Sequence, residues 1–229
     1  MKDIILIVIS FPLLIYLAYQ IRWNIIEPYK KRKNGKSLMK KLKSMDIADA
    51  KILKDCYLPL TPGTTTKADI ILIFQQGICI IKNENREYDI RGRNDEKCWT
   101  QTVSKGYKPL VHSFHNPVWD NNSNILALNN LLKRPDIPVY SLVVFPDECN
   151  LNVPSVCGKA RVIQLKELNK IIRRVCDEKT NVLDAKEIKD LYDKILPCTK
   201  DSLTQQQEHI ESINRMHKKK KHANIILPF

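Results

Sequence analysis

The sequence predicts an α/β fold: a mixed central β-sheet flanked by helices, preceded by one transmembrane helix and followed by a helical tail. Two short apolar runs, at 70–74 and 78–81, flank Gln75-Gln76-Gly77, a pattern typical of a buried β-hairpin. A helical pattern over 116–133 then leads into the apolar strand Val139–Phe145, as expected of a sheet with helices on its faces. The third observation is an uncharged, apolar run near the amino terminus.

That run, Ile4–Ile21, is long enough as a helix to cross about 27 Å of bilayer. A secretory signal peptide is one alternative, but no basic leader and no A-x-A cleavage site accompany the run. A buried core helix is the other alternative. Only one basic residue, Lys2, precedes the run. Six follow it within fifteen residues: Arg22, Lys30, Lys31, Arg32, Lys33 and Lys36. The positive-inside rule therefore predicts a single-pass cell-membrane protein with its N-terminus outside and its globular part in the cytoplasm.

Composition narrows the class of partner. The formal net charge of +13 indicates an anionic partner, either nucleic acid or an anionic membrane surface. The seven cysteines form no C-x-x-C motif, which argues against a zinc ribbon or a disulfide framework and suits a reducing compartment. At 229 residues the chain is long enough to bury one sizeable core.

The remaining elements follow from local patterns. Asn116-Pro117 supplies a cap and a first-turn proline for the helix at 116–133, and Asp184-x-x-Glu187 resembles a capping box. In order, the other predicted elements are a basic linker over Glu27–Lys36, an amphipathic helix over Lys36–Met45, a strand over Ile52–Leu58, a turn at Pro62-Gly63, short strands at Tyr88–Ile90 and Val162-Ile163, and helices over Leu165–Val175, Asp184–Leu196 and from Ser202 into Lys218–Lys221.

An ordered set of residues carries a family resemblance. Asp69, Gly77 with the strand after it, Trp99-Thr100-Gln101 and Asn116-Pro117 resemble the nuclease-related domain (NERD) family from about Lys31 to Leu165. The resemblance implies a restriction-endonuclease-like PD-(D/E)XK fold, whose active site is an Asp followed by Glu-x-Lys. The predicted division of the chain is a transmembrane helix at 4–21, a basic juxtamembrane linker at 22–36, the nuclease-related domain at 37–165 and a helical basic tail at 166–229.

Three positions depart from the family pattern. Gly35-Lys36 stands where the family has Gly-Glu, Lys82-Asn83-Glu84 where it has Glu-x-Lys, and Asp120 where it has Gln. The chemistry implied by the resemblance is Mg²⁺-assisted phosphodiester hydrolysis, with Asp69 and Glu84 as metal ligands and Lys82 as the catalytic lysine. A shift of two residues along a strand displaces a ligand by roughly 7 Å, so these exchanges predict against a tight Mg²⁺ site.

Basic and aromatic residues suggest how an anionic polymer is bound. The candidate nucleic-acid-binding residues are Lys36, Arg91, Arg93, Lys105 and Lys108. Trp99 and Phe114 either stack on bases or anchor a loop over the sheet. His112 and His115 are spaced as a metal-ligand pair if they lie on a helix, although no third ligand is evident. The run Lys218–Lys221 is either solvated charge or a binding site for polyphosphate or lipid.

These observations predict a membrane-anchored, catalytically degenerate nuclease-like module that binds DNA or RNA without sequence preference, or another anionic partner. The alternative is an active Mg²⁺-dependent DNA endonuclease with a rearranged active site. A purely structural or envelope-associated role remains a third possibility.

Overall fold

The computed structural model describes residues 14–18, 20, 27–103 and 108–199, without the side chains of 27–34. The chain divides after Ser44 into two compact units. The first contains helix α2, Glu27–Lys43, whose last turn carries Lys40, Lys41 and Lys43. No helix of the described residues is long and apolar enough to cross a membrane. Most of the predicted span Ile4–Ile21, together with Lys105 and Lys218–Lys221, lies outside the described residues.

The second unit confirms the predicted mixed α/β fold. Its larger sheet has the strand order β1-β2-β3-β7-β10-β9, in which β3, β7 and β10 run parallel and the other neighbours are antiparallel. Its strands are β1 (Lys51–Thr61), β2 (Thr64–Phe74), β3 (Gly77–Asn83), β7 (Val139–Phe145), β9 (Val156–Cys157) and β10 (Ala160–Gln164). The predicted hairpin is β2–β3, and the predicted strand Val139–Phe145 is β7.

Gly77 fixes the close approach of this hairpin to the segment before β7. Its φ angle is +134°, a conformation that other L-residues rarely adopt. A Cβ at this position would lie 2.3 Å from the backbone oxygen of Pro138, which accepts a hydrogen bond from the N–H of Ile78 at 3.0 Å. Only glycine therefore allows β3 to begin beside β7.

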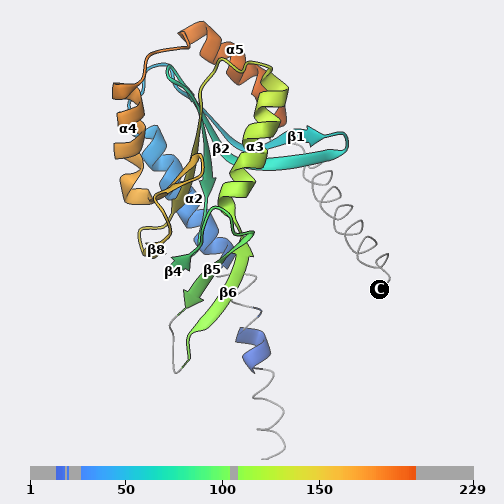
Figure 1. The fold of residues 1–229 in the computed structure, drawn as a ribbon, viewed down its shortest axis with the longest axis vertical. Helices are drawn as coiled ribbons and strands as arrows, with labels where there is room; N and C mark the ends of the chain where they lie inside the picture. The colour runs from blue at the N-terminus through green and yellow to red at the C-terminus, as the bar shows by residue number, and fades with distance from the viewer. Residues whose placement is uncertain (1–13, 19, 21–26, 104–107, 200–229) are drawn as a thin grey trace, which may run out of the picture. The chain divides into compact units, whose positions relative to one another are not determined.

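A smaller second sheet has the order β6-β5-β4-β8 (Figure 1). It consists of β4 (Tyr88–Arg91), β5 (Cys98–Val103), β6 (Leu110–His115) and β8 (Cys149–Asn152). The polar stretch after Trp99, which one of the two interpretations made a loop over the sheet, is the antiparallel pair β5–β6. Trp99 is fully buried in β5, stacks on Phe145 at 6.4 Å and donates its indole N–H to the Arg93 carbonyl.

Helices cover the larger sheet. Helix α3 (Pro117–Leu132) runs beside the β1–β2 hairpin, and α3 and α5 (Ala185–Ile195) pack into one apolar cluster with β1, β2 and β3 (Figure 1). The caps predicted at Asn116 and Asp184 are both formed. The remaining elements are η2 (Leu165–Glu167), α4 (Leu168–Glu178) and η3 (Leu196–Cys198).

Candidate functional site

Three charged side chains meet where β2, β3 and the first turn of α3 come together. Asp69 lies on β2 and Lys82 on β3, and the register that pairs Ile70 with Ile81 places them opposite each other on one face. The ammonium of Lys82 lies 4.0 Å from an oxygen of Asp69 and 3.4 Å from an oxygen of Asp120 in α3. Two of the three predicted catalytic residues therefore meet, together with Asp120.

Two features hold these groups in place. Asp69 accepts a hydrogen bond from the backbone N–H of Asn83 at 3.0 Å. The first turn of α3 is fixed by Asn116, whose side-chain oxygen accepts from the N–H of Val118 at 2.9 Å and whose amide donates to the carbonyl of Glu96 at 2.8 Å. An acidic residue in a first turn is favoured by the helix dipole, which suits Asp120 to this position.

Lys82 is a permanent cation in this centre. Its side chain is only 19% exposed, and that burial works against its charge. The neighbouring carboxylates of Asp69, Asp120 and Glu84 outweigh this burial and raise the pKa of Lys82 above its ordinary value. The ammonium therefore stays charged throughout the physiological pH range.

Glu84, the third predicted catalytic residue, has a different surrounding. Burial raises the pKa of its carboxyl group, with a further contribution from Asp69 and Asp120, although Lys82 and Arg86 oppose the shift. An oxygen of Glu84 lies 3.5 Å from the Nε of Arg86, whose guanidinium stands 4.0 Å above the ring of Phe114. Glu84 thus pairs with Arg86, whereas Lys82 pairs with Asp69 and Asp120.

His115 extends the centre to the surface. Its Nδ1 lies 2.7 Å from the second oxygen of Asp120, and its side chain is about half exposed (51%). His112 and His115 both lie on β6, where residues three apart point to opposite faces, so the proposed histidine ligand pair is wrong. The contact between His115 and Asp120 was not predicted from the sequence. The signal for it was the cap at Asn116, which starts the helix directly after His115 and puts Asp120 in the first turn.

The candidate nucleic-acid-binding residues are scattered around the chain. Arg91 on β4 and Lys108 before β6 are exposed, and Arg93 is exposed but pairs with Asp95 at 3.2 Å. Lys36 is exposed on α2, in the other unit. Trp99 and Phe114 are buried in the core, which rules out the interpretation that they stack on bases and leaves their anchoring role.

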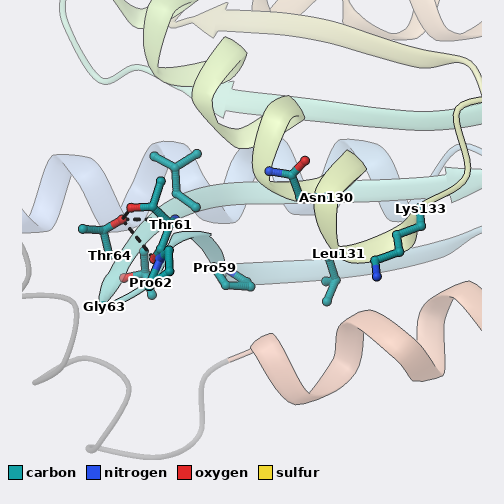
Figure 2. Close-up of a pocket in the computed structure, with 10 residues that line it drawn as sticks. Pro59, Thr61, Pro62, Gly63, Thr64, Asn130, Leu131 and Lys133 are labelled. Atoms are coloured by element: carbon teal, nitrogen blue, oxygen red, sulfur yellow. Dashed lines mark hydrogen bonds between the residues drawn. The ribbon is translucent and has the colours of Figure 1, made fainter.

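An open pocket of about 870 Å³ lies away from the charged centre, between the tip of the β1–β2 hairpin and the end of α3 (Figure 2). Thr61 and Thr64 hydrogen-bond to each other at the tip, facing Asn130, Leu131 and Lys133. The pocket is about 15 Å from Asp120 along the helix. Its lining contains no carboxylate, histidine or cysteine, and Lys133 is its one charged residue.

Comparison with known proteins identifies the family to which the chain belongs. The chain is 28% identical over 171 residues to an uncharacterized protein of Bacillus anthracis, an alignment covering 74% of this chain and 77% of that protein. No solved structure matches this chain. The nuclease-related domain family matches residues 30–146, just over half of the chain, and this stretch contains Asp69, Lys82, Glu84 and Asp120. The chain therefore belongs to the nuclease-related domain family.

Proposed function

We propose that this chain is a membrane-anchored nuclease-related module with a degenerate catalytic centre, and that it binds nucleic acid or another anionic partner without cleaving it. The observation that carries the proposal is the position of Lys82, whose ammonium pairs with both Asp69 and Asp120. A metal-dependent nuclease needs a divalent cation near such carboxylates. Here a side chain of the protein already supplies a positive charge to them.

The donor set does not fit Mg²⁺. That ion requires near-octahedral oxygen ligands at about 2.1 Å and is repelled by a neighbouring ammonium. Asp69 is already bonded to the Asn83 backbone N–H, and Glu84 already pairs with Arg86 at 3.5 Å. Within the described part of the chain, no three His, Cys, Asp or Glu side chains are grouped so as to hold a metal ion.

The restriction-endonuclease-like assignment is also part of this proposal. An antiparallel hairpin β2–β3, a helix α3 across it and a strand β7 parallel to β3 support it. In such an arrangement Asp69 and the end of β3 form one end of the sheet, where the Glu-x-Lys of an active member would stand. The rival function is a Mg²⁺-dependent DNA endonuclease that uses Asp69 and Glu84 from exchanged positions.

Anion binding is supported by charge. The chain carries 38 lysine and arginine residues against 25 aspartate and glutamate residues. Binding driven by neutralised phosphates releases counterions, so its affinity falls steeply as salt rises. We expect the full-length protein, purified in detergent, to bind single- and double-stranded DNA of unrelated sequences with similar affinity. An affinity unchanged between low and moderate salt would remove the nucleic-acid partner.

The membrane anchor rests on the apolar run Ile4–Ile21 and the basic residues behind it. We propose that the globular part faces the cytoplasm. A thiol-reactive probe that cannot cross membranes should then leave the exposed Cys98 unlabelled in intact cells and label it after lysis. Labelling of Cys98 before lysis would reverse the topology.

Loss of catalysis has a direct test. The full-length protein should not cleave plasmid or single-stranded DNA with Mg²⁺ or Mn²⁺ beyond the level of a matched Asp69→Ala preparation, which measures contaminating nuclease. Cleavage that disappears in both Asp69→Ala and Glu84→Ala would establish the rival function. A gain of cleavage in the variant Lys36→Glu, Lys82→Glu, Glu84→Lys, which restores the family pattern, would locate the loss at those positions.

A further inference from the structure

Cys98 differs from the other six cysteines in its exposure. All seven lie in the described part of the chain, and the other six are buried or half-buried. Burial raises the pKa of each of those six thiols, to about 12 for Cys56 and Cys149. Because the thiolate is the reactive form of cysteine, these six are poor nucleophiles in the folded protein.

The residue opposite Cys98 on the adjacent strand is a histidine. The β5–β6 register pairs Cys98 with His115, and both residues point away from the buried face that carries Trp99 and Phe114. In the neighbouring pair of the register, Lys97 and Asn116, the N–H of Asn116 donates to the carbonyl of Lys97. Cys98 and His115 are therefore a non-hydrogen-bonded pair, the kind whose side chains approach most closely, with Cβ atoms about 5 Å apart.

Asp120 sets the orientation of that imidazole. A carboxylate only accepts hydrogen bonds, so the Nδ1 of His115, 2.7 Å from Asp120, carries the proton. In the neutral ring the Nε2 is then the basic nitrogen. His115 is half exposed, so this nitrogen is open to a proton donor at the surface. Nucleophilic cysteines are activated in general by an imidazole that a third group orients, and the strand register brings the Cys98 backbone next to such an imidazole.

We propose that Cys98 and His115, with the imidazole oriented by Asp120, form a thiol–imidazole site that exchanges with low-molecular-weight disulfides. The Nε2 of His115 takes the thiol proton, and the Cys98 thiolate attacks one sulfur of the disulfide. A new sulfur–sulfur bond forms as the old one breaks, and the departing thiolate takes the proton from His115. Cys98 is oxidised to a mixed disulfide and the small disulfide is reduced to one free thiol, so the step balances without another reagent.

The adduct would form at the rim of the charged centre. Asp120 faces His115 with one oxygen and Lys82 with the other, so one carboxylate joins the thiol site to the Lys82 pairs. The proposal does not depend on nucleic-acid binding or on the absence of cleavage. Its failure would leave the proposed function untouched.

The experiment treats the full-length protein with oxidised glutathione at neutral pH without denaturant, followed by acid quenching and peptide mass mapping. We expect the first mixed disulfide at Cys98. The variant His115→Ala should slow its formation by about threefold or more, because the imidazole that takes the thiol proton is then missing. The matched control is His112→Ala, on the same strand but the opposite face, which should leave the rate unchanged.

Two further arms keep the result decisive. Asp120→Asn should also slow the exchange, since the amide no longer fixes the tautomer of His115. His115→Gln, with a thermal unfolding curve matched to the wild type, separates loss of the base from loss of the fold. Earlier modification of any other cysteine, or equal Cys98 rates in wild type and both His115 variants, would overturn the proposal.

Discussion

Replacing Lys82 by methionine removes the ammonium from between Asp69 and Asp120 while keeping a side chain of similar length. At an effective dielectric constant of about 20, charges separated by 3.4 Å attract by about 5 kcal/mol and charges separated by 4.0 Å by about 4 kcal/mol. Desolvation offsets most of this attraction, but removal of one partner from a buried pair typically costs about 3–5 kcal/mol. Because Asp120 is 35% exposed, we expect a smaller loss, about 2–3 kcal/mol of unfolding free energy.

The assay is urea unfolding of full-length wild type and Lys82→Met, followed by thermal melting with and without Mg²⁺. Without its ammonium the centre should gain affinity for a divalent ion, so Mg²⁺ should raise the Tm of the variant and not of the wild type. A gain of about 1 kcal/mol corresponds to about 2–4 °C for a domain of this size. The matched control is Lys194→Met, because Lys194 donates to the carbonyl of Leu132 at 3.1 Å, at the opposite end of α3 from Asp120. It should lose stability without gaining a response to Mg²⁺.

A loss of less than about 0.5 kcal/mol in Lys82→Met, the ordinary range of a surface substitution, would contradict this expectation. Equal stabilisation of the wild type and Lys82→Met by Mg²⁺ would contradict it as well. Either result would mean that the ammonium of Lys82 does not neutralise Asp69 and Asp120 in solution.

Three other changes test the framework of the site by urea unfolding. Asn116→Ala removes a helix cap and leaves the Glu96 carbonyl without its donor, which should cost about 2–4 kcal/mol; a loss no larger than that of an exposed Asn would contradict it. Gly77→Ala should lower stability by more than about 2 kcal/mol through strain and the clash with Pro138, and an unchanged midpoint would contradict it. The raised pKa of Glu84 contributes stability below its ordinary value that is lost as pH rises through the folded value. Glu84→Gln should therefore become more stable relative to wild type as pH rises, and a constant difference would contradict this.

The larger sheet was predictable because its signals are local. The β2–β3 hairpin is two continuous apolar runs around a glycine turn, and β7 is a strand buried on both faces. The pair Asn116-Pro117 predicts the start of α3, and Asn116 is the helix cap in the structure.

The β5–β6 pair could not be predicted because its alternation is obscured. On the inner face of β5, Gln101 stands between Trp99 and Val103, and its amide is satisfied by the Glu87 carbonyl at 2.7 Å. On β6, Val111 is exposed while His112 is half-buried. A polar residue inside and an apolar residue outside remove the period of two on which strand assignment depends.

The partners of Lys82 depend on tertiary contacts that no local pattern contains. Asn121, the residue after Asp120, is fully buried and donates to the carbonyls of Ile80 on β3 and Leu142 on β7, at 3.1 and 3.0 Å. These bonds fix α3 across the two strands and so bring Asp120 over Lys82. The spacing of Lys82 and Glu84 along the strand gave no reason to expect a carboxylate from the helix.

The family resemblance implies Glu-x-Lys where this chain has Lys82-Asn83-Glu84, an exchange that keeps the residue types but reverses the charge at both positions. Position 82 faces Asp69 and Asp120, so an acid there would gather negative charge that only an added cation neutralises. A lysine at this position supplies that cation from within the chain. Position 84 is buried beside Arg86, where a carboxyl group is tolerated because it is paired and its pKa is raised. Of the two exchanges, Lys82 should therefore control divalent-ion affinity, and Lys82→Glu alone should increase it more than Glu84→Lys alone.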